Sequence, residues 1–296
     1  MSNRPAPSRP LTLVSVAALV ALALTGCSEQ PAADPTGSVP PVTSPSATET
    51  PSESPTATPT PTASGEAAVY YVIDTRTGLR LAPEPHDVSG DAVQAAVERM
   101  IAGPDDPDYT STWNPATEVL GVTMGDPITV DLSEDARTAS VGSPGAAIMI
   151  QQLVHTVTAA AGEESAGVLL TIEGEPAGEL WGAVEWSEPV TREAPLDVQH
   201  LVQIDTPREG ATATSPVTVS GQAAVFEATL PWKVLDESGA EVASGSAMTA
   251  EGQTFAPYTF EVELEPGTYS IVITEADPSA GEAGESMSDS KTVTVG

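Results

Sequence analysis

The sequence offers few residues whose types and spacing could support catalysis. Its three histidines, His86, His155 and His200, lie in separate segments, and no pattern groups any of them with a nucleophile. The motifs HExxH, GxSxG, GxxxxGKS/T and GxGxxG, which serve zinc, acyl-transfer, phosphate and dinucleotide chemistry, are missing. We therefore expect a protein that is not an enzyme, with no catalytic residue, no cofactor and no metal.

Acidic side chains raise two further possibilities for a site. Asp105, Asp106 and Asp108 form an acidic loop, and calcium is bound by several oxygen ligands. The glycines and the spacing of an EF-hand are absent, so we expect no metal there. Glu282 and Glu285 lie in a stretch rich in glycine and serine, which is typical of a solvated hairpin tip.

Other side chains could contact a sugar. Trp181 and Trp186 could pack between two domains, which we expect, or form a stacked pair for glycan rings. Three glutamates offer carboxylates, but the sequence cannot place two of them at the separation that a glycosidase needs. These glutamates are Glu98, Glu173 and Glu185.

His155 belongs to a polar face of an expected helix. This face could meet a ligand or a partner; alternatively it is an ordinary amphipathic surface or a hydrogen-bonded packing contact, which is the more common situation. The other members of the face are Gln151, Gln152 and Thr158.

The single cysteine, Cys27, follows an export signal. Arg4 and Arg9 precede an uncharged apolar run, residues 11–25, which is shorter than the roughly 20 residues that span a bilayer. The stretch Leu24-Thr25-Gly26-Cys27 resembles the lipobox of bacterial lipoproteins. The alternatives are a plain secretory signal with a chance cysteine, or an uncleaved anchor.

The lipobox resemblance implies how Cys27 is modified. In that family the chain is cut before the cysteine, and the sulfur receives a diacylglycerol. Two acyl chains suffice for stable anchoring, because each buried CH₂ contributes about 0.8 kcal/mol. We therefore expect a signal peptide at residues 1–26, lipidation of Cys27, and a location on the outer face of the cytoplasmic membrane.

Composition separates a linker from the folded part and limits the partners. Residues 27–66 are rich in proline, serine and threonine and cannot bury a core, so we expect a disordered stalk. The formal net charge of −32 argues against nucleic acid as a partner, because phosphate binding needs lysine and arginine.

The first folded region, residues 67–190, alternates strand and helix patterns. We expect strands at 68–74, 79–81, 119–122, 128–133 and 167–174, and helices ending at Gly103 and Gly162. Asp91 or Ser89 is expected to cap the first helix, and Ser143 the second. The order predicts an α+β domain with its helices on one face of a sheet.

Several residues are spread over this whole region in a recognisable pattern: Tyr71, Leu81, Gly103-Pro104, Pro115, Val119-Leu120, Val130-Asp131-Leu132-Ser133, residues 151–156, Ile172 and Gly174. Through them the region resembles a GerMN domain, the domain of sporulation and spore germination proteins. It departs at Trp113-Asn114-Pro115, where the family more often has an apolar residue before the proline. The resemblance implies a non-catalytic envelope module, related in shape to domains that build protein rings.

The second folded region, residues 199–296, predicts an all-β immunoglobulin-like sandwich. About seven short alternating runs are separated by turn signals, and Trp232 lies in an early strand. Tyr269 could bond a corner through its hydroxyl or simply pack. The region resembles the immunoglobulin-like domain of bacterial spore germination, through Pro207, Gly210, Ser215-Pro216-Val217, Gly221-Gln222-Ala223, Phe226-Glu227, Gly239 and Gly267.

These features predict a membrane-anchored, extracytoplasmic, non-enzymatic lipoprotein. We expect it to mediate protein–protein interaction or assembly in the cell envelope, with an unidentified envelope protein or a second copy of itself as partner. The alternative is a lipoprotein that binds peptidoglycan or a small ligand. A third class, a hydrolase of wall polymers, lacks a motif that supports it.

Overall fold

The computed structural model describes residues 64–276 and 286–296. All of them belong to one compact unit, Pro59–Gly296. Cys27, residues 27–63 of the predicted stalk, Glu282 and Glu285 lie outside the described residues. The predicted stalk end at residue 66 is wrong, because residues 64–66 already pair with β2 as the start of the first strand. Among the described helices, none combines the length and the apolar character needed to cross a membrane.

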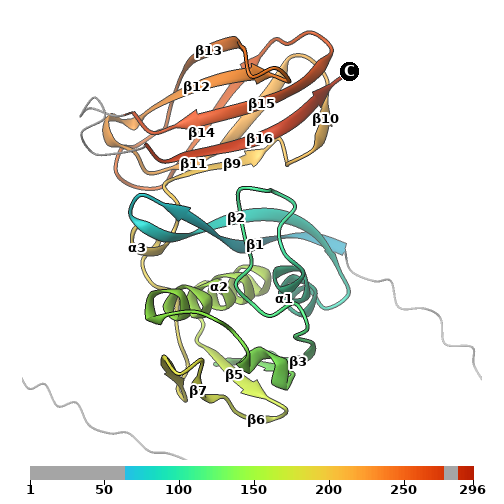
Figure 1. Cartoon of the computed structure of the whole chain (residues 1–296), viewed down its shortest axis with the longest axis vertical. Helices are drawn as coiled ribbons and strands as arrows, with labels where there is room; N and C mark the ends of the chain where they lie inside the picture. The colour runs from blue at the N-terminus through green and yellow to red at the C-terminus, as the bar shows by residue number, and fades with distance from the viewer. Residues whose placement is uncertain (1–63, 277–285) are drawn as a thin grey trace, which may run out of the picture. The chain divides into compact units, whose positions relative to one another are not determined.

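The first domain places two helices between two sheets (Figure 1). One sheet is the hairpin β1 (Ser64–Thr75) and β2 (Gly78–Ser89). The other has the order β3-β4-β5-β6, in which β4 and β5 are parallel. These four strands are β3 (Val119–Thr123), β4 (Ile128–Leu132), β5 (Val168–Ile172) and β6 (Glu175–Pro176). The two helices are α1 (Ala92–Ala102) and α2 (Ser143–Ala161). A small hairpin follows, formed by β7 (Gly178–Leu180) and β8 (Val184–Trp186).

Local chemistry explains both helices of this domain. The Asp91 carboxylate accepts hydrogen bonds from two backbone N–H groups at the start of α1, as a good N-cap does. Helix α2 begins with Gly142 at the N-cap rather than Ser143, and ends at Gly162 in a left-handed conformation. The α+β prediction is confirmed, and the apolar side chains of both helices pack into a core shared with strands of both sheets. The strands expected at 68–74 and 79–81, however, form a separate two-stranded sheet on the other side of the helices.

Strand β2 extends well beyond the three residues predicted for it. It pairs with β1 from Gly78 to Ser89, so His86 lies in this strand. Its two prolines, Pro83 and Pro85, are compatible with a strand because β2 is an edge, and on an edge the alternate N–H groups that point away from the neighbouring strand make no ladder bond. A short helix, α3 (Pro195–Val198), leads from this domain into the next.

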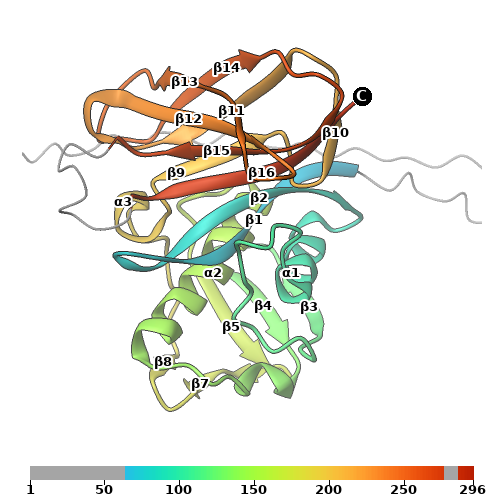
Figure 2. The same cartoon turned by 45° about the horizontal axis from the view of Figure 1, so that its top comes forward.

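The second domain is a β-sandwich of two sheets (Figure 2). The larger sheet has the order β10-β16-β15-β12-β13 and the smaller has the order β14-β11-β9. Alternate residues of both sheets form one apolar core. The strands are β9 (Val202–Thr206), β10 (Ala211–Ala213), β11 (Val217–Ala223), β12 (Thr229–Asp236), β13 (Glu241–Met248), β14 (Ala256–Val262), β15 (Gly267–Thr274) and β16 (Ser288–Val295).

Two aromatic residues of this sandwich were singled out in the sequence. Trp232 packs against the core and stacks on Phe260, with ring centroids 4.7 Å apart. The Tyr269 hydroxyl donates a hydrogen bond to the Glu265 carbonyl at 3.0 Å, which confirms the corner bond as the better of the two interpretations.

A buried ionic cluster joins the two domains. Lys291 of β16 is only 2% exposed, and its ammonium donates to Asp106 Oδ2 (2.5 Å), Asp289 Oδ1 (2.9 Å) and the Tyr109 hydroxyl (2.9 Å). The Tyr109 hydroxyl donates to Asp289 Oδ1 at 2.7 Å. Asp106 and Tyr109 belong to the loop after α1, so the first domain supplies one carboxylate and the second domain the other. We call these four residues the Lys291 cluster.

Every polar group of the Lys291 cluster is hydrogen-bonded. The three N–H donors of the ammonium have three acceptors. Asp106 Oδ1 accepts from the Asp108 N–H, and Asp289 Oδ2 accepts from the Ile204 N–H. Burial alone would lower the pKa of Lys291, but the Asp289 and Asp106 carboxylates outweigh it and raise that pKa. The lysine is therefore charged, and its removal would leave two buried carboxylates without a cation.

We predict that Lys291→Met lowers the free energy of unfolding by about 3–5 kcal/mol, because breaking one side of a buried ion pair leaves uncompensated charge. Chemical denaturation measures this change. Lys233→Met is the matched control, since Lys233 is the other lysine of the chain and is exposed. Equal stabilities of the two variants would contradict the role given to the cluster.

Candidate functional site

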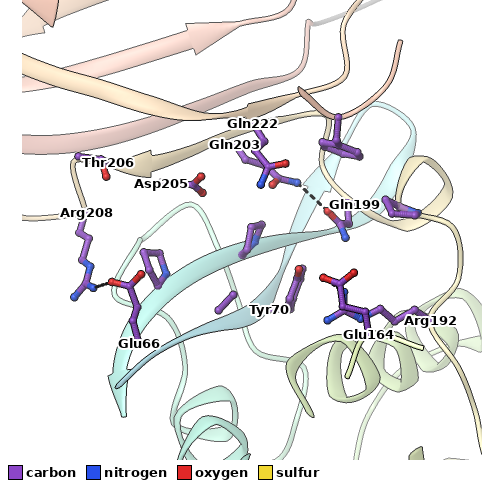
Figure 3. A pocket seen from close by; sticks show the side chains of 15 residues that line it. Glu66, Tyr70, Glu164, Arg192, Gln199, Gln203, Asp205, Thr206, Arg208 and Gln222 are labelled. Atoms are coloured by element: carbon purple, nitrogen blue, oxygen red, sulfur yellow. Dashed lines mark hydrogen bonds and ion pairs between the residues drawn. The ribbon is translucent and has the colours of Figure 1, made fainter. Parts of the chain in front are cut away.

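A groove of about 460 Å³ lies between β1 and β2 on one side and β9 and β11 on the other. Figure 3 shows Asp205, Gln203 and Gln222 on one wall and Tyr70 on the facing wall. The other lining residues include prolines of β2, Gln199, and two arginines that are each paired with a glutamate. This volume lies within the range of small-ligand sites, about 300–1,000 Å³.

Ion pairs border the groove at both ends (Figure 3). Arg208 pairs with Glu66 of β1 and with Asp87 of β2. Arg192 pairs with Glu164 at 3.4 Å, and its guanidinium lies 5.9 Å from the centre of the Tyr70 ring. The charges of both arginines are thus compensated within the protein, and neither is a free site for an anion.

Asp205 is a carboxylate inside the groove without a hydrogen bond or ion pair to any described residue. Burial, reinforced by the charge of Asp289, raises the pKa of Asp205 to about 6. Lys291 opposes this shift and Glu66 adds to it. A part-buried acid that the fold leaves unpaired is typical of a binding position rather than of a structural one.

Close backbone approach shapes the wall that carries Gln203 and Gln222. A Cβ at Gly221 would lie 1.9 Å from the Gln203 carbonyl oxygen and 2.7 Å from the Tyr258 hydroxyl, so only glycine fits. The Tyr258 hydroxyl donates to that same carbonyl at 2.8 Å. Glycine at this position therefore allows the irregularity between β11 and β9 that sets the two glutamines side by side.

His155 lies behind Tyr70 and is fully buried. Its ring centroid is 5.0 Å from that of Tyr70, and the Gln199 amide lies 3.4 Å from its Nδ1. Burial, with help from Arg192, lowers the pKa of His155 to about 3, so the ring is neutral at physiological pH. Its Nε2 has no partner among the described residues.

The polar face around His155 is buried rather than solvated. The Gln152 amide donates to the Tyr70 carbonyl at 3.0 Å, and the Gln151 amide donates to the Thr191 carbonyl at 3.2 Å. The interpretation of this face as hydrogen-bonded packing is confirmed, whereas the interpretation as an amphipathic surface is wrong. A buried polar face is expected of a helix that packs against strands on more than one side, because such a helix has little surface left for solvent.

The three carboxylates of the acidic loop are bound by other side chains of the protein. Asp105 pairs with Arg99, Asp106 with Lys291, and the Asp108 carboxylate accepts a hydrogen bond from Ser290. These aspartates therefore do not converge on one point where calcium could bind.

One group in the described part of the chain has the composition of a metal site. The ligand atoms of Glu84, His86 and Asp105 lie within 4.8 Å of one another. Arg99 Nε, however, donates to His86 Nδ1 at 3.2 Å, and Glu84 accepts the backbone N–H of Asp105 at 3.0 Å. Burial would raise the pKa of Glu84, but the hydrogen bond from His86 and these N–H groups lower it. The group positions the acidic loop, with Arg99 as its cation.

The remaining residues predicted from sequence do not build a site. Trp181 and Trp186 both belong to the core of the first domain, so the expectation that they pack between domains is wrong, and so is the stacked pair for glycan rings. Trp186 is 1% exposed, and the Trp181 ring instead packs edge-on against Trp113. The three candidate glutamates are exposed on different elements, near α1, β5 and β8.

Sequence reasoning missed the groove residues. Asp205 and Gln203 alternate with Val202 and Ile204 in β9, and this alternation shows only that they point away from the sandwich core. They lie opposite Tyr70 only because of the way in which the two domains dock, and no local sequence pattern predicts that docking.

We predict that Asp205→Asn stabilises the protein at pH 8 by about 1–3 kcal/mol but has little effect at pH 4. In the unfolded chain the pKa returns to about 4, so the native state binds more protons between pH 4 and pH 6 and loses stability as pH rises through that window. Urea denaturation at both pH values measures this, with the exposed Asp74→Asn as control. The same change at both pH values would contradict it.

Comparison with known proteins agrees with the domain pattern. The family model for sporulation and spore germination matches residues 68–178, and the model for the immunoglobulin-like domain of bacterial spore germination matches residues 201–282. Among curated proteins, none matches the chain.

Three solved structures show weak likenesses. The tandem GerMN domains of the sporulation protein GerM from Bacillus subtilis align with 18% identity and a TM-score of 0.37, over 44% of this chain and 46% of that one. CopC from Methylosinus trichosporium OB3b aligns with 21% identity and a TM-score of 0.25, over 32% and 90%. An engineered protein aligns with 19% identity and a TM-score of 0.27, over 53% and 38%.

The chain spans about half the length of the GerM structure, and likenesses at these TM-scores carry no argument. The matched family models carry the assignment, and their descriptions name no reaction. The chain therefore contains a region that matches the sporulation and spore germination model, followed by a region that matches the immunoglobulin-like domain of bacterial spore germination.

Proposed function

We propose that the protein is a lipid-anchored, extracytoplasmic component of the cell envelope that acts by binding another envelope protein or a second copy of itself. Its role is non-catalytic and belongs to the sporulation and germination type. Lipid on Cys27 holds it at the outer face of the cytoplasmic membrane, and the proline-rich segment between Cys27 and β1 lifts the two domains away from the lipid.

The observation that carries this proposal is the Lys291 cluster. Because it joins the domains through buried, fully satisfied contacts, residues of both domains form one preformed surface. A preformed surface binds a partner at a lower entropic cost than two domains that must first be ordered. A protein whose work is recognition needs this arrangement, whereas a flexible spacer does not.

The chemistry of the described residues supports a non-catalytic role. The Nε2 of His86 faces the Tyr71 hydroxyl and Glu84, His155 contacts Gln199, and His200 Nε2 lies 3.0 Å from the Ser288 carbonyl. Within residues 64–276 and 286–296, none of the three histidines is hydrogen-bonded to a serine or threonine hydroxyl that it could activate.

A second candidate function is the binding of peptidoglycan or a small ligand. The groove favours it, since its polar lining contains groups without a protein partner. The two functions are compatible, because the groove occupies only part of the surface of the two domains.

Membrane attachment is predicted to depend on one atom, the sulfur of Cys27. Cys27→Ala should move the protein from the membrane fraction to the soluble extracytoplasmic fraction, because the remaining sequence after residue 27 has no acyl chain to bury. Fractionation of cells, together with metabolic labelling by a fatty-acid analogue, measures the change. Unlabelled wild-type protein, or a labelled Cys27→Ala variant, would contradict lipidation at this position.

Site-specific photo-cross-linking in intact cells tests the partner. A photoreactive residue is placed at the exposed apolar positions Leu120 (46% exposed), Phe226 (49%) and Met248 (68%), with exposed Glu98 as the polar control. We expect at least one apolar position to capture a defined envelope protein or a second copy, because apolar residues at a surface serve as contact anchors.

Capture should weaken in the Lys291→Met variant, in which the composite surface is no longer fixed. If well-expressed protein yields no cross-linked species from any of the three positions, the protein-partner proposal fails.

A further inference from the structure

The groove contains polar groups that the fold leaves without partners. The Tyr70 hydroxyl, the Asp205 carboxylate and the Gln222 amide make no hydrogen bond to any described residue. Gln203 is 4% exposed; its amide nitrogen donates to His200 and Gln199, while its Oε1 has no protein donor. These atoms are open to solvent in the free protein, so a ligand that enters the groove must bond to them in place of water.

A second, shallower hollow continues from the groove. It is lined by the same Asp205 and Gln222, then by Ser220 and Thr259 of the small sheet, and reaches Met248. Asp205 and Gln222 therefore stand where the two hollows meet. The combined site is elongated along the sheet β14-β11-β9, which suits a chain-like ligand better than a compact one.

The unpartnered groups define the chemistry of that ligand. A carboxylate and an amide oxygen accept hydrogen bonds, while a phenol, an amide and alcohols can both donate and accept. Vicinal hydroxyls match this mixture, and hydroxyl bonds to a carboxylate are among the stronger kinds. Ala68 of β1 and Pro83 and Pro85 of β2 add apolar side chains to the lining, against which the carbon face of a ring can lie.

Charge excludes anionic ligands. Asp205 is unpaired, Arg192 and Arg208 are compensated by Glu164 and Glu66, and the chain carries a formal net charge of −32. A phosphorylated or carboxylated polymer would meet repulsion without a free cation to offset it.

We infer that this elongated groove binds a neutral oligosaccharide, with Asp205 and Gln222 contacting its hydroxyls where the two hollows meet. The inference deepens the ligand-binding candidate of the proposed function and is independent of the protein partner. Cross-linking can therefore fail while sugar binding succeeds, and the reverse.

Calorimetric titration of the full chain in detergent with chitotetraose and with cellotetraose tests this inference. We expect saturable binding of at least one of them to the wild type. Asp205→Asn and Gln222→Ala should weaken that binding at least about tenfold, since hydrogen bonds to charged groups are worth more than neutral ones. Asp74→Asn, an exposed carboxylate outside the groove, should bind as the wild type does.

The Asp205→Asn variant is informative because it removes a carboxylate without a protein partner, so the fold is expected to be retained. Absence of binding to both tetrasaccharides, or equal binding by the Asp205→Asn and Asp74→Asn variants, would overturn the inference. Preferential binding of a peptide that Asp205→Asn abolishes would also overturn it, and would assign the groove to a peptide.

Discussion

The two domains depend on one buried ammonium, that of Lys291. It lies between a carboxylate of each domain and 4.5 Å from the centre of the Tyr109 ring. Asp289, its neighbour in β16, also accepts the Ile204 N–H and so fixes the start of β9. Because charges are costly to bury, this cluster is stable only when all its members are present, and it therefore specifies a single docking of the domains.

The Lys291 cluster and the groove follow opposite rules of hydrogen bonding. Each polar atom of the cluster has its partner, as a structural network requires. One residue along β9 from Ile204, Asp205 points into the groove and has none among the described residues. The polar groups thus have protein partners in the Lys291 cluster, where the domains are in contact, and lack them in the groove. This difference is expected of a binding site at a domain boundary.

The parts of the fold that local chemistry controls could be predicted. Most strands of both domains show alternating apolar and polar residues. Helix α1 begins after its N-cap, Asp91, and ends before its C-cap, Gly103. Strand β13 gives no such signal, because its residues are mostly small and exposed and lack an apolar period. The role of Lys291 could not be predicted, because its partner Asp106 lies 185 positions away in the sequence. The groove was missed for the same reason, since docking brings Asp205 to Tyr70.

The most direct test of this account is the distance between the domains in solution. Spin labels at the exposed positions Glu98 of α1 and Glu241 of β13, in a chain with Cys27→Ser, report that distance by pulsed electron paramagnetic resonance. We predict one narrow distance distribution for this chain and a broad one when Lys291→Met is added. A broad distribution with Lys291 intact, or the same narrow one without it, would contradict the claim that the buried ammonium fixes the two domains as one body.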